Sequence, residues 1–169
     1  MKQNDFIDAV LPFKDKLYRL AKRILVSNDE AEDAVQEVYL KLWKGRERIQ
    51  KYKSPEAFAM TMTKNYCLDR LKSKQASNLK LIHSNYQEKD TPLQRRIELN
   101  DSVSLVHKLI ENLPEQQKLV IQLRDVEEYE FDEIAKMLDL QPTAVRVTLS
   151  RARKTIREQL TKQHNYGIS

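Results

Sequence analysis

The side chains with the clearest chemical potential are two groups of arginines and lysines, and the chemistry that they suit is the binding of a polyanion. One group, which follows an acidic stretch near the C-terminus, comprises Arg146, Arg151, Arg153, Lys154, Arg157 and Lys162. The other, which follows an acidic stretch in the first half, comprises Lys41, Lys44, Arg46, Arg48, Lys51 and Lys53, with Tyr52 between the last two lysines. Cationic groups at this density can neutralise phosphates, whereas a pair of solvated helical faces is the alternative explanation.

Residues suited to catalysis or metal binding are few. The chain has one cysteine, Cys67, which excludes an intramolecular disulfide and a zinc site built from several thiolates. The three histidines, His83, His107 and His164, are scattered along the chain. No nucleophile–base pair, carboxylate dyad within a motif or glycine-rich phosphate loop is evident. We therefore predict no catalytic centre, no metal and no cofactor, and we interpret Cys67 as a small core residue.

The composition predicts an all-α protein. Only two glycines and five prolines occur in 169 residues, which leaves little room for hairpins or a many-stranded sheet. With 40% hydrophobic and 33% charged residues, a chain of this length suits one medium or two very small domains. No apolar run approaches the roughly 18 residues of a membrane span, and the N-terminus lacks the apolar stretch of a signal peptide. We therefore expect a cytoplasmic protein.

The spacing of apolar residues predicts the helices that would carry the first basic group. An amphipathic helical region runs over residues 6–26 and is bent or broken at Pro12. A second helix begins at Ser27, which forms a capping-box pattern with Glu30, and it ends at Gly45.

A loop over residues 46–53 then leads into a third helix. Ser54 is its predicted N-cap and Pro55 its first helical residue. This helix is apolar on most of its sides, so we expect it to be central to the domain. Residues 75–101 are mostly polar and lack sustained periodicity, so we interpret them as a linker that follows a first domain of residues 1–74.

A second domain, predicted over residues 102–163, would carry the other basic group. Apolar spacing indicates one helix before Pro114 and another that Pro114 begins. A short helix over 131–138, a tight turn at Asp139 and a longer helix from Pro142 to about Leu160 then read as a helix-turn-helix. Residues 164–169 would form a tail.

The last helix has one apolar stripe and one polar face. At 100° per residue, Val145, Leu149, Ala152, Ile156 and Leu160 fall together and should pack inward. The opposite face carries Thr143, Arg146, Val147, Ser150 and Lys154, with Arg153 and Arg157 at its flanks. A helix in the major groove reads bases near its N-terminus and binds phosphates with lysine and arginine. Thr143 and Val147 suit base contacts, Val147 through a thymine methyl group, although an ordinary surface valine is the alternative.

The second helix offers a face suited to a protein partner. Its apolar stripe leaves Leu40 on the opposite side, together with Asp33, Gln36 and Glu37. If the core of the domain does not reach Leu40, a partner with basic charge and an apolar groove would cover it. A singly exposed leucine is the alternative.

The third helix has a short polar face. Thr61, Asn65 and Lys72 share one side, and Lys64 lies elsewhere around the helix. Beside a basic loop that contains Tyr52, such a face suits the capture of unpaired DNA by charge and stacking. A structural role for Asn65 is the alternative.

Taken together, these segments resemble a bacterial sigma factor of the extracytoplasmic-function (ECF) group. The resemblance covers nearly the whole chain. In the first half it is carried by residues 17–25 (LYRLAKRIL), 29–43 (DEAEDAVQEVYLKLW) and 64–71 (KNYCLDRL). In the second half it is carried by residues 113–117 (LPEQQ), 123–127 (LRDVE), 131–135 (FDEIA) and 150–154 (SRARK). The block 29–43 is very specific to the group.

The resemblance implies roles for these residues. The first domain would dock on the clamp helices of the largest subunit of core RNA polymerase through Asp33, Gln36, Glu37 and Leu40, and the flap of the second-largest subunit would be a further contact. The minus-ten promoter element would be recognised and opened by Arg46, Arg48, Lys51, Tyr52, Lys53, Phe58, Thr61, Lys64, Asn65 and Lys72. The minus-thirty-five element would be read by Gln141, Thr143, Arg146, Val147, Ser150, Arg151, Arg153, Lys154 and Arg157. The linker would thread the polymerase, which would perform the chemistry.

The same resemblance implies a regulator. An anti-sigma factor, which in this group is often membrane-bound, would silence the protein by covering its polymerase-binding faces. A membrane-bound partner of this kind would hold the otherwise cytoplasmic protein at the inner membrane.

Some residues depart from the pattern of the group. Phe58 stands where tryptophan is usual, and Thr61 replaces a common basic residue, which bears on the details of strand opening. Asp139 stands where the helix-turn-helix of this group usually has a glycine in its turn, and Glu130 stands where the group usually has a helix-capping serine. Aspartate tolerates the left-handed conformation, so we expect the turn to persist. Four residues of the minus-thirty-five set differ from the commonest ones, which predicts a divergent element preference: Gln141, Thr143, Val147 and Ser150.

Two other functions are compatible with parts of the pattern. A transcription regulator could use the helix-turn-helix without docking on polymerase, and the docking face of the first domain argues against it. A helical adaptor protein would use the basic face of residues 146–157 only for solvation, and a steep salt dependence of DNA affinity would exclude it.

Overall fold

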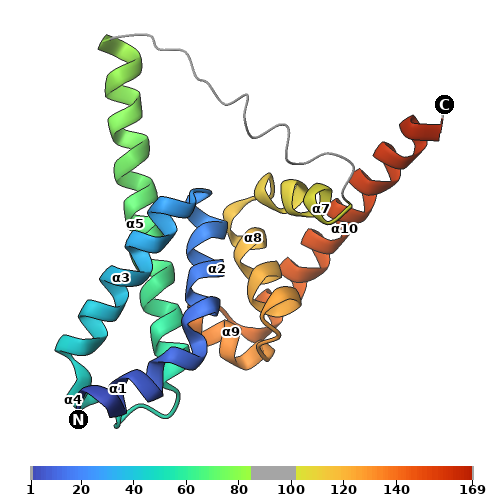
Figure 1. Cartoon of the computed structure of the whole chain (residues 1–169). Helices are drawn as coiled ribbons and strands as arrows, with labels where there is room; N and C mark the ends of the chain where they lie inside the picture. The colour runs from blue at the N-terminus through green and yellow to red at the C-terminus, as the bar shows by residue number, and fades with distance from the viewer. Residues whose placement is uncertain (1, 85–101, 169) are drawn as a thin grey trace.

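The computed structural model describes residues 2–84 and 102–168, and all regular elements within these ranges are helices (Figure 1). They form two groups, one on each side of residues 85–101, which lie outside the described residues. The all-α prediction is therefore confirmed. None of the described helices is long and apolar enough to cross a membrane.

The first group contains α1 (Gln3–Val10), the 3-10 turn η1 (Leu11–Phe13), α2 (Lys14–Leu25), α3 (Asn28–Lys44), α4 (Arg46–Ile49) and α5 (Pro55–Ser84). The predicted break at Pro12 is confirmed, because η1 separates α1 from α2 there. Proline has no N–H to donate to the preceding turn, so the α-helical hydrogen bonding is interrupted.

Local side chains fix the starts of α3 and α5. The Ser27 hydroxyl accepts a hydrogen bond from the Glu30 N–H at 3.2 Å, and the Ser54 hydroxyl accepts one from the Ala57 N–H at 3.1 Å. Both predicted N-caps are confirmed. The carboxylate of Glu30 pairs with Lys74 of α5 at 2.9 Å, so it ties two helices together.

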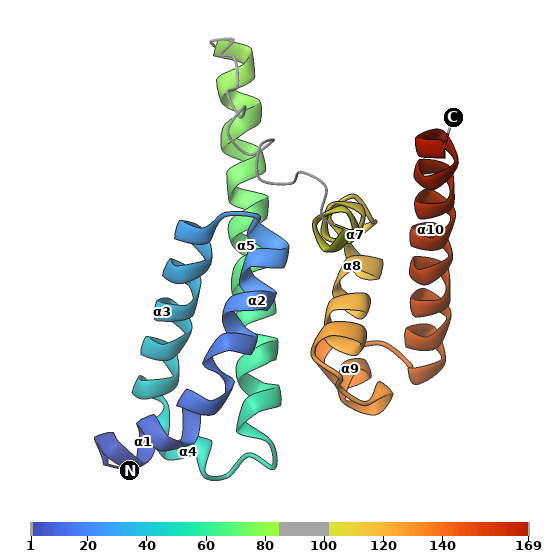
Figure 2. The same ribbon diagram turned by 45° about the vertical axis from the view of Figure 1, so that its right-hand side comes forward.

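The core of the first domain lies where α2 packs against both α3 and α5, and Figure 2 shows the three helices side by side. Leu17, Leu20 and Ile24 of α2 are almost completely buried, as are Val38 of α3 and Met60 of α5. Helix α5 contacts α1, α2 and α3, so the prediction that it is central to the domain is confirmed, and it also contacts α9 of the second domain. Cys67 is buried in this core, and burial raises the pKa of its thiol to about 12, in line with a structural role.

Two segments differ from the sequence-based expectation. Residues 46–49, predicted as loop, form the short helix α4, whose Ile49 is buried and whose Arg46 guanidinium lies over the Trp43 ring at 4.0 Å. Helix α5 continues to Ser84, through residues interpreted as linker. Polar residues can continue an established helix without an apolar stripe, because propagation needs no core contact.

The second group contains α7 (Ser102–Glu111), α8 (Glu115–Ile121), the π-helical turn η2 (Gln122–Val126), α9 (Phe131–Leu138) and α10 (Pro142–Ile168). Asp139 ends α9 in the left-handed conformation, with φ 55° and ψ 52°, so the predicted turn is confirmed. Helix α10 runs beyond Leu160 and through most of the residues expected to form a tail.

The core of the second domain contains the predicted stripe of α10. Val145, Leu149 and Ala152 are buried, and Ile156 and Leu160 are half-buried. Helix α10 packs on α8 and α9 through this side, which leaves its polar face to solvent.

Leu20 offers a direct test of this packing. The substitution Leu20→Ala should destabilise the protein by about 2–5 kcal/mol, because it leaves a cavity where α2 meets α3 and α5. The measurement is urea unfolding followed by circular dichroism. The matched control is Leu11→Ala, since Leu11 is 55% exposed, and it should change stability by no more than about 0.5 kcal/mol. Equal effects of the two substitutions would contradict the described core.

Candidate functional site

Helix α3 presents a mixed acidic and apolar face. Its buried side supplies Ala34, Val35 and Val38 to the core, which turns Asp33, Gln36 and Leu40 outward. Glu37 lies among them and is half-buried. The Leu40 side chain is 47% exposed, so the core of the domain does not reach it. The structure therefore brings all four predicted polymerase contacts to one surface.

The segment between α3 and α5 combines basic charge with an aromatic pair. Arg48, Lys51 and Lys53 are exposed. The rings of Tyr52 and Phe58 stack with their centroids 4.2 Å apart and their planes 16° apart. Stacking of this kind favours a fixed arrangement of the two rings beside the charges.

Arg46 does not share this exposed position. Its Nη1 donates a hydrogen bond to the Trp43 carbonyl oxygen at 2.9 Å, and its guanidinium is packed on the indole ring. The geometry gives Arg46 a structural role in holding α4 against α3, in addition to any contact with DNA.

The predicted residues of α5 are placed differently from one another. Asn65 and Lys72 are exposed, whereas the Thr61 hydroxyl donates to the Ala57 carbonyl oxygen at 3.0 Å. The Lys64 ammonium donates to the Met137 carbonyl oxygen of α9 at 2.8 Å, and burial lowers its pKa. Lys64 is thus engaged by the second domain.

The polar face of α10 is open to solvent. The predicted DNA contacts that are exposed on this face are Thr143, Arg146, Val147, Ser150, Arg151, Lys154 and Arg157. Gln141, which precedes the helix, is exposed as well. Val147 is 45% exposed, which makes it an apolar residue on a charged surface. Arg153 is also exposed, but it forms a two-point ion pair with Asp125 of η2, with one bond at 3.0 Å. This pairing raises the pKa of Arg153 and aims it away from the centre of the face.

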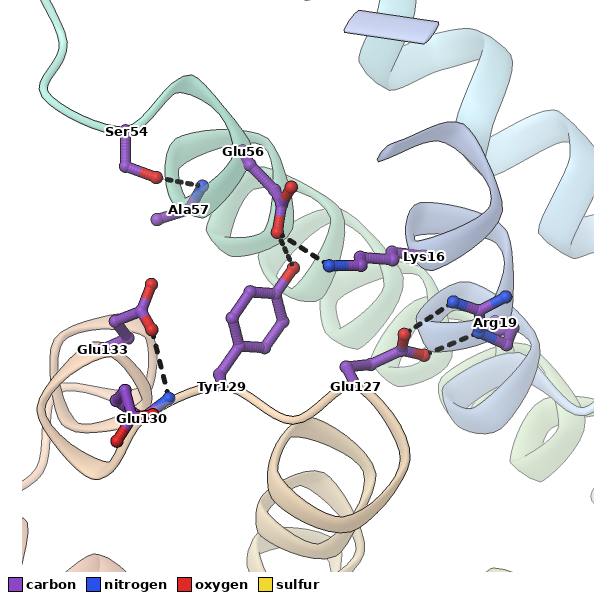
Figure 3. Close-up of polar contacts among 9 residues, drawn as sticks. All are labelled: Lys16, Arg19, Ser54, Glu56, Ala57, Glu127, Tyr129, Glu130 and Glu133. Carbon is purple, nitrogen blue, oxygen red and sulfur yellow. Dashed lines mark hydrogen bonds and ion pairs between the residues drawn. The ribbon is translucent and has the colours of Figure 1, made fainter. Parts of the chain in front are cut away.

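The two domains are joined by a polar interface that sequence reasoning missed. The Arg19 guanidinium of α2 donates two hydrogen bonds, of 2.8 and 2.7 Å, to the two carboxylate oxygens of Glu127 (Figure 3). The Glu127 side chain is only 1% exposed. Gln122 donates a third bond to this carboxylate at 3.1 Å, so the buried charge has a full set of partners.

Arg23, which unlike Arg19 is buried, extends the same interface. The Arg23 guanidinium donates to the Gln122 side-chain oxygen at 2.8 Å and to Nδ1 of His107 at 2.7 Å. Because arginine only donates, His107 accepts here through Nδ1. Burial lowers the pKa of Arg23, whose partners in this contact are neutral groups.

A third contact ties α5 to the segment before α9. The Tyr129 hydroxyl donates to a Glu56 carboxylate oxygen at 2.6 Å, and Lys16 donates to the same oxygen at 3.1 Å (Figure 3). Burial, and then the bond to Glu56, raise the pKa of Tyr129, so the phenol stays protonated as the donor.

One signal in the sequence could have indicated this interface. Gln122 interrupts an otherwise apolar run over residues 119–123, and Arg23 lies beside the apolar stripe of α2. Polar residues in such positions are buried only with partners. Glu127 lacked such a signal, because it lies in an acidic stretch, where a solvated carboxylate is the usual case.

Comparison with known proteins identifies the family. Residues 10–77 match the family described as Sigma-70 region 2, and residues 104–156 match Sigma-70, region 4. The chain belongs to the ECF sigma factors. These proteins act in promoter-specific initiation of transcription, and the two matched regions coincide with the two helical groups.

Individual ECF sigma factors match over most of their lengths. The chain is 24% identical to the ECF RNA polymerase sigma factor SigW of Bacillus subtilis, covering 94% of this chain and 90% of that protein. It is 26% identical to the ECF RNA polymerase sigma-E factor of Escherichia coli strain K12, covering 91% and 85%.

Solved structures of other proteins share the fold. The sigma factor RpoE of Bartonella quintana, in complex with the anti-sigma factor NepR, superposes with a TM-score of 0.75 at 20% identity, over 93% of this chain and 97% of that chain. CnrH, in complex with the cytosolic domain of CnrY, gives a TM-score of 0.67 at 19% identity, over 95% and 90%.

Arg19→Ala should open the contact between the two domains of this sigma factor. Removing Arg19 leaves the almost completely buried Glu127 carboxylate without its counter-charge, which is unfavourable, and separation of the domains would return Glu127 to water. We expect a larger radius of gyration by small-angle X-ray scattering. The control is Lys74→Ala, which removes an ion pair within the first domain and should leave the radius unchanged.

A second variant separates charge from packing. Arg19→Ala combined with Glu127→Gln should recover the compact form, since a buried amide needs no counter-charge. Scattering of Arg19→Ala identical to that of the unsubstituted protein would contradict the assigned role of this ion pair.

Proposed function

We propose that this ECF sigma factor binds core RNA polymerase through α3, reads the minus-thirty-five element with α10, and opens the minus-ten element with residues 46–72. The observation that carries the proposal is the presence of three separate exposed faces, one acidic and apolar and two basic, in a chain that contains both sigma-70 regions. We assign polymerase binding and minus-ten opening to a domain of residues 1–74, and minus-thirty-five recognition to residues 102–163. Passage through the polymerase is assigned to the linker, residues 75–101, of which residues 75–84 continue α5.

The docking face of α3 suits a helical partner with basic charge. Asp33 and Glu37 supply two carboxylates on the same face as the exposed Leu40, which follows them along the helix, and Gln36 supplies a neutral hydrogen-bonding group. An apolar centre with a polar rim is the usual composition of a protein interface. We assign this face to the clamp helices of the largest subunit.

The second domain offers an apolar groove for another polymerase contact. Val106, Ile110 and Ile156 are among the residues that line a hollow of about 330 Å³ between α7, α8 and α10. Arg153 and Arg157 border it. We assign this groove to the flap of the second-largest subunit, since an apolar segment with acidic flanks would fit both its lining and its border.

Recognition of DNA is divided between the two basic faces. Helix α10 would lie in the major groove, with Thr143, Arg146 and Val147 near base edges and Arg151 and Lys154 on phosphates. Lys51, Lys53 and Arg48 would hold the strand near the minus-ten element, where the Tyr52–Phe58 pair offers an aromatic surface for an unpaired base.

Binding both elements requires the domains to separate. The names minus-ten and minus-thirty-five place the two elements about 25 base pairs apart, which corresponds to about 85 Å of duplex at 3.4 Å per base pair. The domains are in direct contact, and Lys64 is bound to α9. We therefore infer that polymerase binding replaces the interface at Arg19 and Glu127, and that this frees Lys64 for DNA.

An anti-sigma factor is a further expected partner. Two solved structures that share this fold were determined as complexes, one with an anti-sigma factor and one with the cytosolic domain of a partner protein. We propose that such a regulator covers the α3 face and the groove of the second domain, and that a membrane-bound one would hold this cytoplasmic protein at the inner membrane.

The docking face is tested by replacing Asp33, Gln36, Glu37 and Leu40 together with alanine. Loss of the apolar centre and both charges should weaken binding to bacterial core RNA polymerase by at least about tenfold. The measurement is size-exclusion co-elution, followed by titration with a fluorescent label on the sigma factor.

A control in the same domain is matched in chemistry. Asp5, Asp8 and Leu11, replaced together with alanine, remove two exposed carboxylates and an exposed leucine from α1 and η1. This variant should bind like the unsubstituted protein. Failure of the unsubstituted protein to join the polymerase would instead favour an independent helix-turn-helix regulator.

The aromatic pair is tested by Tyr52→Leu. Loss of one base-stacking ring should reduce open-complex formation roughly 5- to 150-fold, measured by permanganate reactivity of unpaired thymines. The deficit should shrink on a template already mismatched at the minus-ten element, because unpairing is then no longer required. Tyr18→Leu, at another half-buried tyrosine of the same domain, is the control. Open complexes at the level of the unsubstituted protein would exclude the role of Tyr52.

A further inference from the structure

Two arginines of the second domain lie over one aromatic ring. The guanidinium carbon of Arg124 is 4.5 Å from the centroid of the Phe131 ring, and that of Arg146 is 5.1 Å from it. Phe131 is the first residue of α9 and is half-buried, whereas the core of that helix is made by Ile134, Ala135 and Met137. The ring therefore lies at the edge of the core, where one part of it packs and another meets the arginines.

The two arginines differ in how they are held. Arg124 is fixed from several directions, because its Nη1 donates to the Tyr129 carbonyl oxygen at 2.9 Å and lies 3.8 Å from the Glu130 carboxylate. Arg146 is exposed and, within the described residues, forms no ion pair. The ring is thus the contact that restrains the Arg146 guanidinium, and the donors of that guanidinium remain available to a ligand.

A restrained arginine binds more favourably than a free one. Arginine carries large rotamer entropy, part of which is lost when its planar group forms paired hydrogen bonds. An aromatic face attracts a guanidinium and limits the directions in which it points. The Phe131 ring therefore reduces the number of rotamers open to Arg146 before the ligand binds, and it keeps the N–H donors oriented.

We propose that Phe131 is a positioning residue that preorganises Arg146 for contact with a base edge of the minus-thirty-five element. This inference rests on the proposed function of α10. Two donors of a guanidinium match the two acceptors of guanine in the major groove, so the chemistry that Arg146 would recognise is a guanine. Phe131 itself makes no contact with the DNA in this arrangement.

The experiment uses the full-length protein with bacterial core polymerase and a pool of DNA fragments randomised across the minus-thirty-five element. The variants are Phe131→Leu, Phe131→Tyr, Arg146→Ala and Arg151→Ala, and the combinations of Phe131→Leu with Arg146→Ala and with Arg151→Ala. Affinity for the selected sequence, and for each single-base change in it, is measured by competition.

Phe131→Leu should weaken binding about two- to fivefold, because leucine keeps the apolar volume and removes the ring. The loss should concentrate at the base position that Arg146→Ala also relaxes. Phe131→Tyr, which keeps the ring, should bind like the unsubstituted protein. In the Arg146→Ala background, Phe131→Leu should have no further effect. Combined with Arg151→Ala instead, it should add its full effect, since Arg151 does not contact the ring.

The outcomes separate this inference from the function on which it rests. If the polymerase complex selects no DNA sequence, the proposed function fails. If it selects one and Phe131→Leu weakens binding equally with and without Arg146, the ring has a structural role only and the inference is overturned. Melting temperatures are measured beside the affinities. Should Phe131→Leu fail to fold, Phe131→Met replaces it in the same cycle, with the same two decisive outcomes.

Discussion

The burial of a single carboxylate determines how the two domains meet. Glu127 is almost completely buried, and an isolated charge in that position would be strongly unfavourable. Arg19 neutralises it from α2 while Gln122 satisfies it from η2. Once this contact is made, Tyr129 comes within reach of Glu56, and α9 lies against α5 where Lys64 bonds to a carbonyl oxygen. The arrangement of the second domain on the first follows from these partners.

An interface of this composition suits a protein whose domains must part. Ion pairs and hydrogen bonds between the domains are replaced by contacts with water when the domains separate. They therefore hold the domains in one geometry, and their loss costs less free energy than exposing an apolar core would. Each domain keeps its own core, with Leu20 central to one and Val145 to the other. The apolar core of each domain therefore fixes its binding face, whereas polar contacts hold the two domains together.

Local features of the structure could be predicted from the sequence, and contacts between distant segments could not. Capping by Ser27 and Ser54, the break at Pro12 and the turn at Asp139 depend on neighbours in the chain. The stripe of α10 and the exposed face of α3 follow from helical periodicity. Lys64 was expected on a DNA-binding surface, and its bond to α9 depends on the fold of both domains. Helix α4 is a single turn whose Ile49 is buried against the rest of the domain, and that burial depends on the fold of the domain.

Transcription in a reconstituted system tests the central claim most directly. Bacterial core RNA polymerase is incubated with promoter-containing genomic fragments, with and without this protein, and the 5′ ends of the transcripts are sequenced. The account predicts new transcripts that depend on the protein and share two upstream elements at fixed spacing. Transcripts that are identical with and without the protein, although it co-elutes with the polymerase, would contradict the claim.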